Sequence, residues 1–242
     1  MSSTAKTAIV LVDPYNDFLH PEGKANHILA ESMADTNTLF HLKNLVTAAR
    51  AHKIPIYYGL HQQVKAGFLA GWNHPTSTQE AQKENHVFEA GTWGVEIFEG
   101  LEPDVEGNGD VVVSKHWCSS SFQNTDLEYQ LRQRDITHLV FAGLTANTCL
   151  ESTARYAFEL GYRVTMLKDA TAGFSTVLKD AATDLIWPLF ANEQDQDHNE
   201  HLIRGTFVRA DLGSGSPVVS GKTENASNPP IKSLLNLGSK EA

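Results

Sequence analysis

Short apolar runs alternate along this chain with longer segments of helical periodicity, and this alternation constrains the fold more than any other feature. The run Ala8–Val12 is apolar without interruption, as expected of a strand that is buried on both faces. Strands that alternate with helices form parallel sheets with right-handed crossovers and helices on both faces. We therefore predict an α/β domain of three layers, αβα, with a parallel sheet of five or six strands.

The expected elements follow this alternation from the first strand to the last helix. The expected strands are residues 7–13, 54–58, 111–115, 138–142 and 163–167, with an edge strand at 206–208, and the expected helices are residues 33–52, 126–134, 148–160 and 176–190. Residues 61–109 are predicted to be irregular, and they are rich in Trp, His, Asn and Gly. Long loops in compact domains are usually functional, so we expect this stretch to cover a substrate pocket and to contribute an oligomer contact.

Composition limits the class of protein and its partners. The chain has 242 residues, of which 41% are hydrophobic, which suffices for one core. We predict one domain over residues 1–212 and a disordered tail over 213–242, where Gly, Ser, Asn and Pro dominate. The net charge of −10 argues against nucleic acid and membrane surfaces as partners. With two cysteines, no apolar run of membrane-spanning length and no signal-peptide pattern at the start, we expect a cytoplasmic protein.

Three of the expected strands lead into residues that carry chemistry. Asp13 and Lys115 end the first and third strands, and Cys149 lies on the first turn of the helix after the fourth. The carboxyl ends of parallel strands share one edge, where ligands bind. A thiol at a helix N-terminus lies among free backbone N–H groups, which favour the thiolate. Taken singly, these residues could instead be a buried hydrophobe, a turn cap and a solvated strand end.

Taken together, the three motifs resemble the isochorismatase-like cysteine hydrolases. The resemblance covers about residues 6–210, and it is carried by the segments Leu11–Phe18, Val113–Lys115 with Ser121-Phe122, and Gly143–Cys149 with Ser152–Arg155. It implies a Rossmann-like three-layer fold and a catalytic triad of Asp13, Lys115 and Cys149. It also implies a non-proline cis peptide at Leu144–Thr145, in a turn whose backbone N–H groups of Thr145 and Cys149 form the oxyanion hole.

Each member of this triad has a distinct expected role. Cys149 attacks a carbonyl, Asp13 takes the thiol proton, and the Lys115 ammonium holds the pair in its active charge state. We expect the three side-chain tips to lie roughly 3–5 Å apart. With an ammonium beside it and a helix N-terminus beneath it, Cys149 should titrate below the free-thiol pKa of about 8.5.

Further residues near the motifs are candidates for the wall of the substrate pocket. They are Asn16, Asp17, Phe18, Trp93, His116, Trp117, Phe122 and Asn147. Each of them could equally cap a turn or pack in the core. Cys118 is expected to pack near the pocket wall without a chemical role.

No metal or other cofactor is expected. Nicotinamidases of the family that this sequence resembles hold an ion with an Asp-x-His pair after the second strand, and the corresponding stretch here is Gly59-Leu60-His61, without the carboxylate. His61, His74 and His86 show no spacing typical of metal ligands. The sequence therefore argues against nicotinamidase activity, and it predicts that activity survives chelation.

The leading prediction is a homo-oligomeric hydrolase that cleaves a small amide, ureide or carbamoyl C–N bond through a thioester. The runner-up is isochorismate hydrolysis, in which a vinyl ether is cleaved and pyruvate released. Several enzymes of that kind use the Asp as a general acid and lack the cysteine, so Cys149 favours acyl chemistry. A third alternative is a catalytically idle binding protein on the same fold, which the presence of Asp13, Lys115 and Cys149 disfavours.

Overall fold

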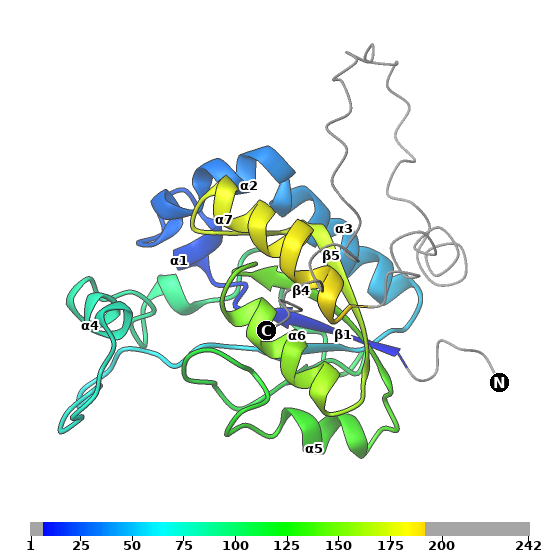
Figure 1. Ribbon diagram of the computed structural model, residues 1–242. Coiled ribbons are helices and arrows are strands. Elements are labelled where there is room, and N and C mark those ends of the chain that lie inside the picture. Colours follow the sequence, from blue (N-terminus) through cyan, green and yellow to red (C-terminus); the bar gives the residue numbers. More distant parts are fainter. Residues whose placement is uncertain (1–6, 192–242) are drawn as a thin grey trace, which may run out of the picture. The chain divides into compact units, whose positions relative to one another are not determined.

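A single parallel sheet organises the part of the chain that the computed structural model describes, residues 7–191 (Figure 1). Its strands lie in the order β3-β2-β1-β4-β5, and every neighbouring pair is parallel. They are β1 (Thr7–Val12), β2 (Ile56–Gly59), β3 (Val111–Val112), β4 (His138–Leu144) and β5 (Arg163–Ala172). The prediction of a parallel sheet with five or six strands is confirmed, and the described residues form five. The edge strand predicted at 206–208 and the tail at 213–242 lie outside the described residues.

Helices cover both faces of this sheet, as the alternation predicted (Figure 1). The α-helices of the described residues are α1 (Asn16–Leu19), α2 (Ala30–Thr36), α3 (Thr38–Ala51), α4 (Ser77–Glu84), α5 (Leu127–Arg132), α6 (Cys149–Glu159) and α7 (Thr176–Asp180). Side chains of the central strand β1 alternate between the faces. Ile9 and Leu11 pack in the same core as the buried side of α3, whereas Val10 and Val12 pack with α5 and α6. Burial on both faces explains why β1 is apolar throughout.

Several predicted elements differ in their extent, among them two helices and the third strand. The helix expected over 33–52 is broken at Asn37, whose φ of 50° is a left-handed conformation that asparagine tolerates better than most residues. The helix expected over 176–190 consists of α7, a π-helical turn (Ala181–Ile186) and a 3₁₀ turn (Trp187–Leu189) that contains a proline. The third strand has two residues where five were expected.

The stretch 61–109 is more regular than predicted. It contains α4, which begins with a capping box between Thr76 and Gln79. Figure 1 shows α4 on an arm that extends away from the sheet. Val64 pairs with Glu89 at the base of this arm, and Phe88 returns into the core with 4% of its surface exposed. A groove lined by residues between 64 and 90 runs along the arm.

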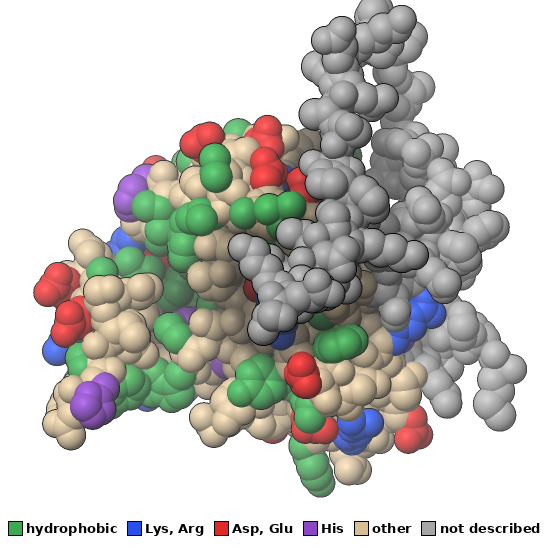
Figure 2. Space-filling model, in the orientation of Figure 1, with side chains coloured by type: hydrophobic (Ala, Val, Ile, Leu, Met, Phe, Trp, Pro, Cys, Tyr) green, Lys and Arg blue, Asp and Glu red, His purple; other side chains and the backbone are tan. Residues whose placement is uncertain are grey.

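The surface carries apolar side chains in places. Figure 2 shows green side chains over α2 and α7, and four large ones near α7 are exposed: Val177, Leu178, Leu185 and Leu189. Acidic and basic side chains are interspersed on the drawn face of the described residues (Figure 2). Within residues 7–191, every helix falls short of the length and apolar character that crossing a membrane requires.

Candidate active site

Asp13 lies at the carboxyl end of the central strand, with its side chain fully buried. Its backbone N–H donates to the Gly59 carbonyl at 2.9 Å, so the residue is tied to the end of β2. Its Oδ1 accepts hydrogen bonds from the His61 backbone N–H at 2.7 Å and from His116 Nε2 at 3.2 Å. Its Oδ2 is buried without a partner among the described residues. Asp13 thus keeps one carboxylate oxygen free for chemistry.

His116 is the side-chain hydrogen-bond partner of Asp13. Its backbone pairs with that of His61, its ring is fully buried, and its Nδ1 faces the carbonyl of Trp117. Burial alone would lower the pKa of His116, but the Asp13 carboxylate and the Trp117 carbonyl outweigh burial and raise that pKa from its ordinary value. The surroundings therefore favour the imidazolium, which donates from both ring nitrogens.

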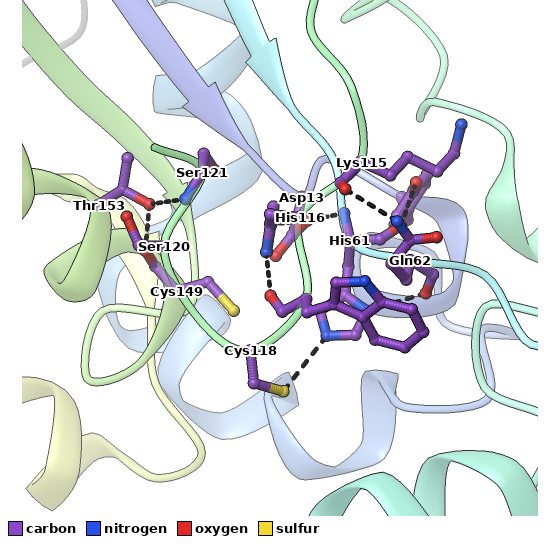
Figure 3. A network of polar contacts seen from close by, with 12 residues as sticks. Asp13, His61, Gln62, Lys115, His116, Cys118, Ser120, Ser121, Cys149 and Thr153 are labelled. Atoms are coloured by element: carbon purple, nitrogen blue, oxygen red, sulfur yellow. Dashed lines mark hydrogen bonds and ion pairs between the residues drawn. The ribbon is translucent and has the colours of Figure 1, made fainter. Parts of the chain in front are cut away.

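Lys115 does not reach this cluster. Figure 3 shows its side chain directed away from Asp13 and Cys149. Its carbonyl accepts a hydrogen bond from Gln62 Nε2 at 2.9 Å, and no ion pair between its ammonium and Asp13 is present within residues 7–191. The place beside Asp13 that was expected for Lys115 is taken by the next residue, His116. A catalytic role for Lys115 stays an untested prediction.

Cys149 is the first residue of α6 and is 8% exposed. Asp13, His116 and Cys149 each offer one ligand-type atom, and these three atoms lie within 4.8 Å of one another (Figure 3). The three residues come from three segments that the sheet order brings together, because β1 lies between β2 and β4. The predicted convergence of acid and thiol at the carboxyl edge of the sheet is confirmed.

The turn before Cys149 connects β4 to α6. The peptide bond between Leu144 and Thr145 is cis, as predicted. Gly143 has a φ of 106°, and a Cβ there would lie 2.1 Å from the carbonyl oxygen of Val12, so only glycine fits against β1. Among the backbone hydrogen bonds that residues 7–191 make outside the helices and strands, none is donated by the N–H of Thr145 or Cys149. Both groups are available as the donors that the oxyanion hole requires.

The prediction that Cys149 titrates below an ordinary thiol is wrong. Burial, followed by the nearby Asp13 carboxylate, raises the pKa of Cys149 well above its usual value. The expectation failed because the ammonium of Lys115 is directed elsewhere and because the helix terminus lies in a buried site. Burial and the Asp13 carboxylate therefore both favour the thiol form of Cys149 over the thiolate.

A second thiol and imidazole lie beside the cluster. His61 Nε2 is 3.5 Å from Cys118 Sγ, and His61 Nδ1 is 2.8 Å from the Gln62 carbonyl. Burial lowers the pKa of His61, which is therefore neutral, with its proton on the Nδ1 that faces the carbonyl. Burial raises the pKa of Cys118, as does Asp13. Cys118 is thus an unionised thiol at the edge of the site.

The remaining predicted pocket residues lie in several places. The side chains of Asn16 and Asp17 form hydrogen bonds with the backbone of other segments. Asn16 Nδ2 donates to the Trp93 carbonyl at 3.1 Å, and Asp17 Oδ2 accepts from the Phe88 N–H at 2.6 Å. Phe18 and Phe122 are buried in the cores on opposite faces of the sheet.

The other three candidates lie nearer the surface or the nucleophile. Trp93 is 43% exposed and packs edge-on against His20, and Trp117 packs against Phe68 and Trp72. Asn147, two residues before Cys149, has a buried side-chain oxygen without a partner among the described residues. Substrate contact by these residues stays a prediction.

Comparison with known proteins gives a consistent assignment. The isochorismatase domain model matches residues 7–197. The ureidoacrylate amidohydrolases RutB of Rhizobium rhizogenes and Agrobacterium fabrum are 32% and 31% identical to this chain over 177 residues, which make up 69% of this chain and 70% and 76% of those proteins. A crystal structure of a cysteine hydrolase from Pseudomonas syringae pv. phaseolicola is 26% identical, with a TM-score of 0.64 over 78% of this chain and 88% of that one.

A second solved structure agrees. An isochorismatase family protein from Desulfovibrio vulgaris subsp. vulgaris is 25% identical, with a TM-score of 0.63 over 77% of this chain and 92% of that one. The family model spans the whole described sheet and all three clustered residues. The chain belongs to the isochorismatase family of hydrolases.

Proposed function

We propose that this protein hydrolyses a C–N bond of a small amide, ureide or carbamoyl compound through a thioester on Cys149. The observation that carries the proposal is the buried cluster in which the Asp13, His116 and Cys149 atoms lie within 4.8 Å of one another. A carboxylate, an imidazole and a thiol at this spacing supply a base, a cation and a nucleophile. The similarity to ureidoacrylate amidohydrolases supports a ureide or amide as the substrate class.

The first half of the proposed reaction forms the thioester. Asp13 takes the proton of the Cys149 thiol as the sulfur attacks the carbonyl carbon, and the carbonyl oxygen becomes an oxyanion. The backbone N–H groups of Thr145 and Cys149 stabilise that oxyanion. As the C–N bond breaks, Asp13 returns the proton to the leaving nitrogen, so an amine or ammonia departs.

The second half regenerates the thiol. Asp13, again a carboxylate, takes a proton from a water molecule that attacks the thioester carbonyl. The C–S bond breaks, and the proton on Asp13 passes to the sulfur. The unpartnered Oδ2 of Asp13 suits both transfers, since no other hydrogen bond within residues 7–191 competes for it.

His116 keeps Asp13 ionised, which is the charge state that these proton-transfer steps need. An imidazolium 3.2 Å from Oδ1 stabilises the Asp13 carboxylate before each proton transfer. The raised pKa of Cys149 keeps the sulfur protonated until a substrate is present. Proton transfer is thereby coupled to attack, which limits reaction of a free thiolate with other electrophiles.

The test is a panel of small ureido acids, primary amides and isochorismate, with ammonia and pyruvate release as separate readouts. We expect ammonia release, together with an acyl adduct on Cys149 that intact-mass measurement detects in quenched reactions. Cys149→Ala should give neither signal, and Cys118→Ala, which keeps the clustered thiol, should form the adduct. Pyruvate release from isochorismate at equal rates in the wild type and in Cys149→Ala would replace this proposal with vinyl-ether cleavage.

Assembly and location remain predictions. We infer a homo-oligomer in the cytoplasm, and the exposed apolar side chains near α7 support self-association. Light scattering coupled to gel filtration should give a mass that is a multiple of the 26.6 kDa chain.

A further inference from the structure

Asp13, His116 and Cys149 provide an oxygen, a nitrogen and a sulfur atom, the set of donor types that zinc takes in proteins. In a tetrahedral site, zinc lies about 2.0–2.3 Å from its ligands, which places the ligand atoms roughly 3.4–3.6 Å apart. Asp13 Oδ1 and His116 Nε2 are already 3.2 Å apart, and all three atoms lie within 4.8 Å. A shift of about 1 Å therefore brings the sulfur into ligand position.

Two further observations point to a cation at this place. Asp13 Oδ2 is fully buried and has no partner within residues 7–191, so the carboxylate has an unused acceptor in the site. The Nδ1 of His116 is held by the Trp117 carbonyl, which leaves Nε2 to face Asp13. Metal-binding histidines show this same arrangement, in which one ring nitrogen donates to a carbonyl and the other binds the metal.

The identity of residue 116 decides whether such a site exists. An ammonium beside Asp13, as the sequence led us to expect from Lys115, would offer no lone pair and would repel a metal ion. An imidazole can lose its second proton and become a ligand. The cluster can therefore exist in a catalytic form, with protons on His116 and Cys149, and in a form in which a metal ion replaces both protons.

We propose that Asp13, His116 and Cys149 bind one zinc ion, with water as the fourth ligand, and that bound zinc switches hydrolysis off. Inhibition follows because a thiolate that coordinates zinc is not free to attack a carbonyl and because the bound carboxylate cannot accept its proton. The binding part depends on the cluster alone, whereas the inhibition part rests on the proposed function. Zinc opposes catalysis here, so this site differs from one for a metal that assists the reaction.

The binding test uses the full chain after dialysis against EDTA. Zinc is titrated in competition with a chromophoric chelator, and cobalt serves as a spectroscopic probe. We expect one equivalent of zinc and a thiolate-to-cobalt charge-transfer band. Cys149→Ala should abolish the band and weaken zinc binding by at least about 100-fold, more than the 10–100-fold cost of losing an outer partner. His116→Lys should also abolish binding.

Two control variants separate this site from others. Cys118→Ala removes the neighbouring thiol that contacts His61, and His86→Ala removes a surface imidazole that pairs with Glu89. Both should keep stoichiometric zinc. Binding that survives in Cys149→Ala, or that is lost in Cys118→Ala instead, would overturn the assignment of the ligands.

The inhibition part has its own readout. Zinc at one equivalent should lower turnover of an identified substrate by at least tenfold, and EDTA should restore it. Stoichiometric zinc at Cys149 without a fall in turnover would refute the switch. Because the cobalt band is recorded without substrate, failure of the proposed hydrolysis leaves the binding result interpretable.

Discussion

Substitution of His116 should lower stability and activity strongly, whereas substitution of its neighbour Lys115 should change both very little. His116→Ala leaves the fully buried Asp13 carboxylate with the His61 N–H, at 2.7 Å, as its remaining hydrogen-bond donor within residues 7–191. Removing one partner of a buried ion pair costs about 3–5 kcal/mol. Because that N–H stays and the carboxyl can take up a proton, we expect the lower end, about 3 kcal/mol.

For a chain of this length, such a loss corresponds to a fall in Tm of about 6–12 °C. Lys115→Ala removes a side chain that is directed away from the cluster, and it should change stability by less than about 0.5 kcal/mol. Loss of the cation beside the base should also lower kcat/KM by roughly 100-fold or more in His116→Ala. Lys115→Ala should stay within about threefold of the wild type, as expected of a substitution that touches no reacting group.

Differential scanning calorimetry compares the Tm values of the two variants, and steady-state ammonia release compares their kcat/KM. His116→Lys is the matched control, because it returns a cation to the same backbone position. It should recover part of the lost stability. The reasoning is refuted if Lys115→Ala loses as much stability and activity as His116→Ala, since the lysine would then be the partner of Asp13.

Three further predictions follow from the same cluster. Asp13→Asn and Cys149→Ala should each abolish turnover, and circular dichroism should show that both variants keep the fold of the wild type. Cys118→Ala should stay active. An active Cys149→Ala would reverse the choice of nucleophile. The pKa of His116 is raised in the fold, so its contribution to stability should be complete below the unfolded value of about 6.5 and should vanish as pH rises through the folded pKa. Urea unfolding gives the free energies of unfolding of the wild type and of His116→Gln at each pH. If the difference between these free energies grows above pH 7, the prediction is contradicted. Because the pKa of Cys149 is raised, iodoacetamide should label it slowly at pH 7 and faster above pH 9, and rapid labelling at pH 7 would contradict a resting thiol.

The sheet was predictable because its signal is local and repeated. Strands such as β1 and β4 are buried on both faces and therefore read as unbroken apolar runs, and the helices between them require parallel pairing. The positions of Asp13 and Cys149 follow from that topology, since Asp13 comes directly after β1 and Cys149 begins the helix that follows β4. The break at Asn37 was missed because a single left-handed residue does not interrupt helical periodicity.

Lys115 was expected beside Asp13, and the next residue, His116, lies there instead, for a physical reason. β3 has only two residues, so no alternation of buried and exposed positions extends to residues 115 and 116. Which of them faces Asp13 is decided by the pairing of His116 with His61, a contact between segments far apart in the chain. The raised pKa of Cys149 was missed for a related reason, because burial of a helix N-terminus depends on the complete fold.

Because Cys149 is 8% exposed and protonated at rest, we expect hydrogen peroxide to oxidise it slowly in the folded protein. A chain that opens locally presents the same sulfur to solvent with the ordinary pKa of a free thiol. Sulfenic and sulfinic acid should therefore accumulate first on molecules whose site has opened. The fraction of oxidised Cys149 would then increase with the frequency at which the sheet edge opens. The same burial that keeps Cys149 protonated before substrate binds would also protect its thiol from oxidation.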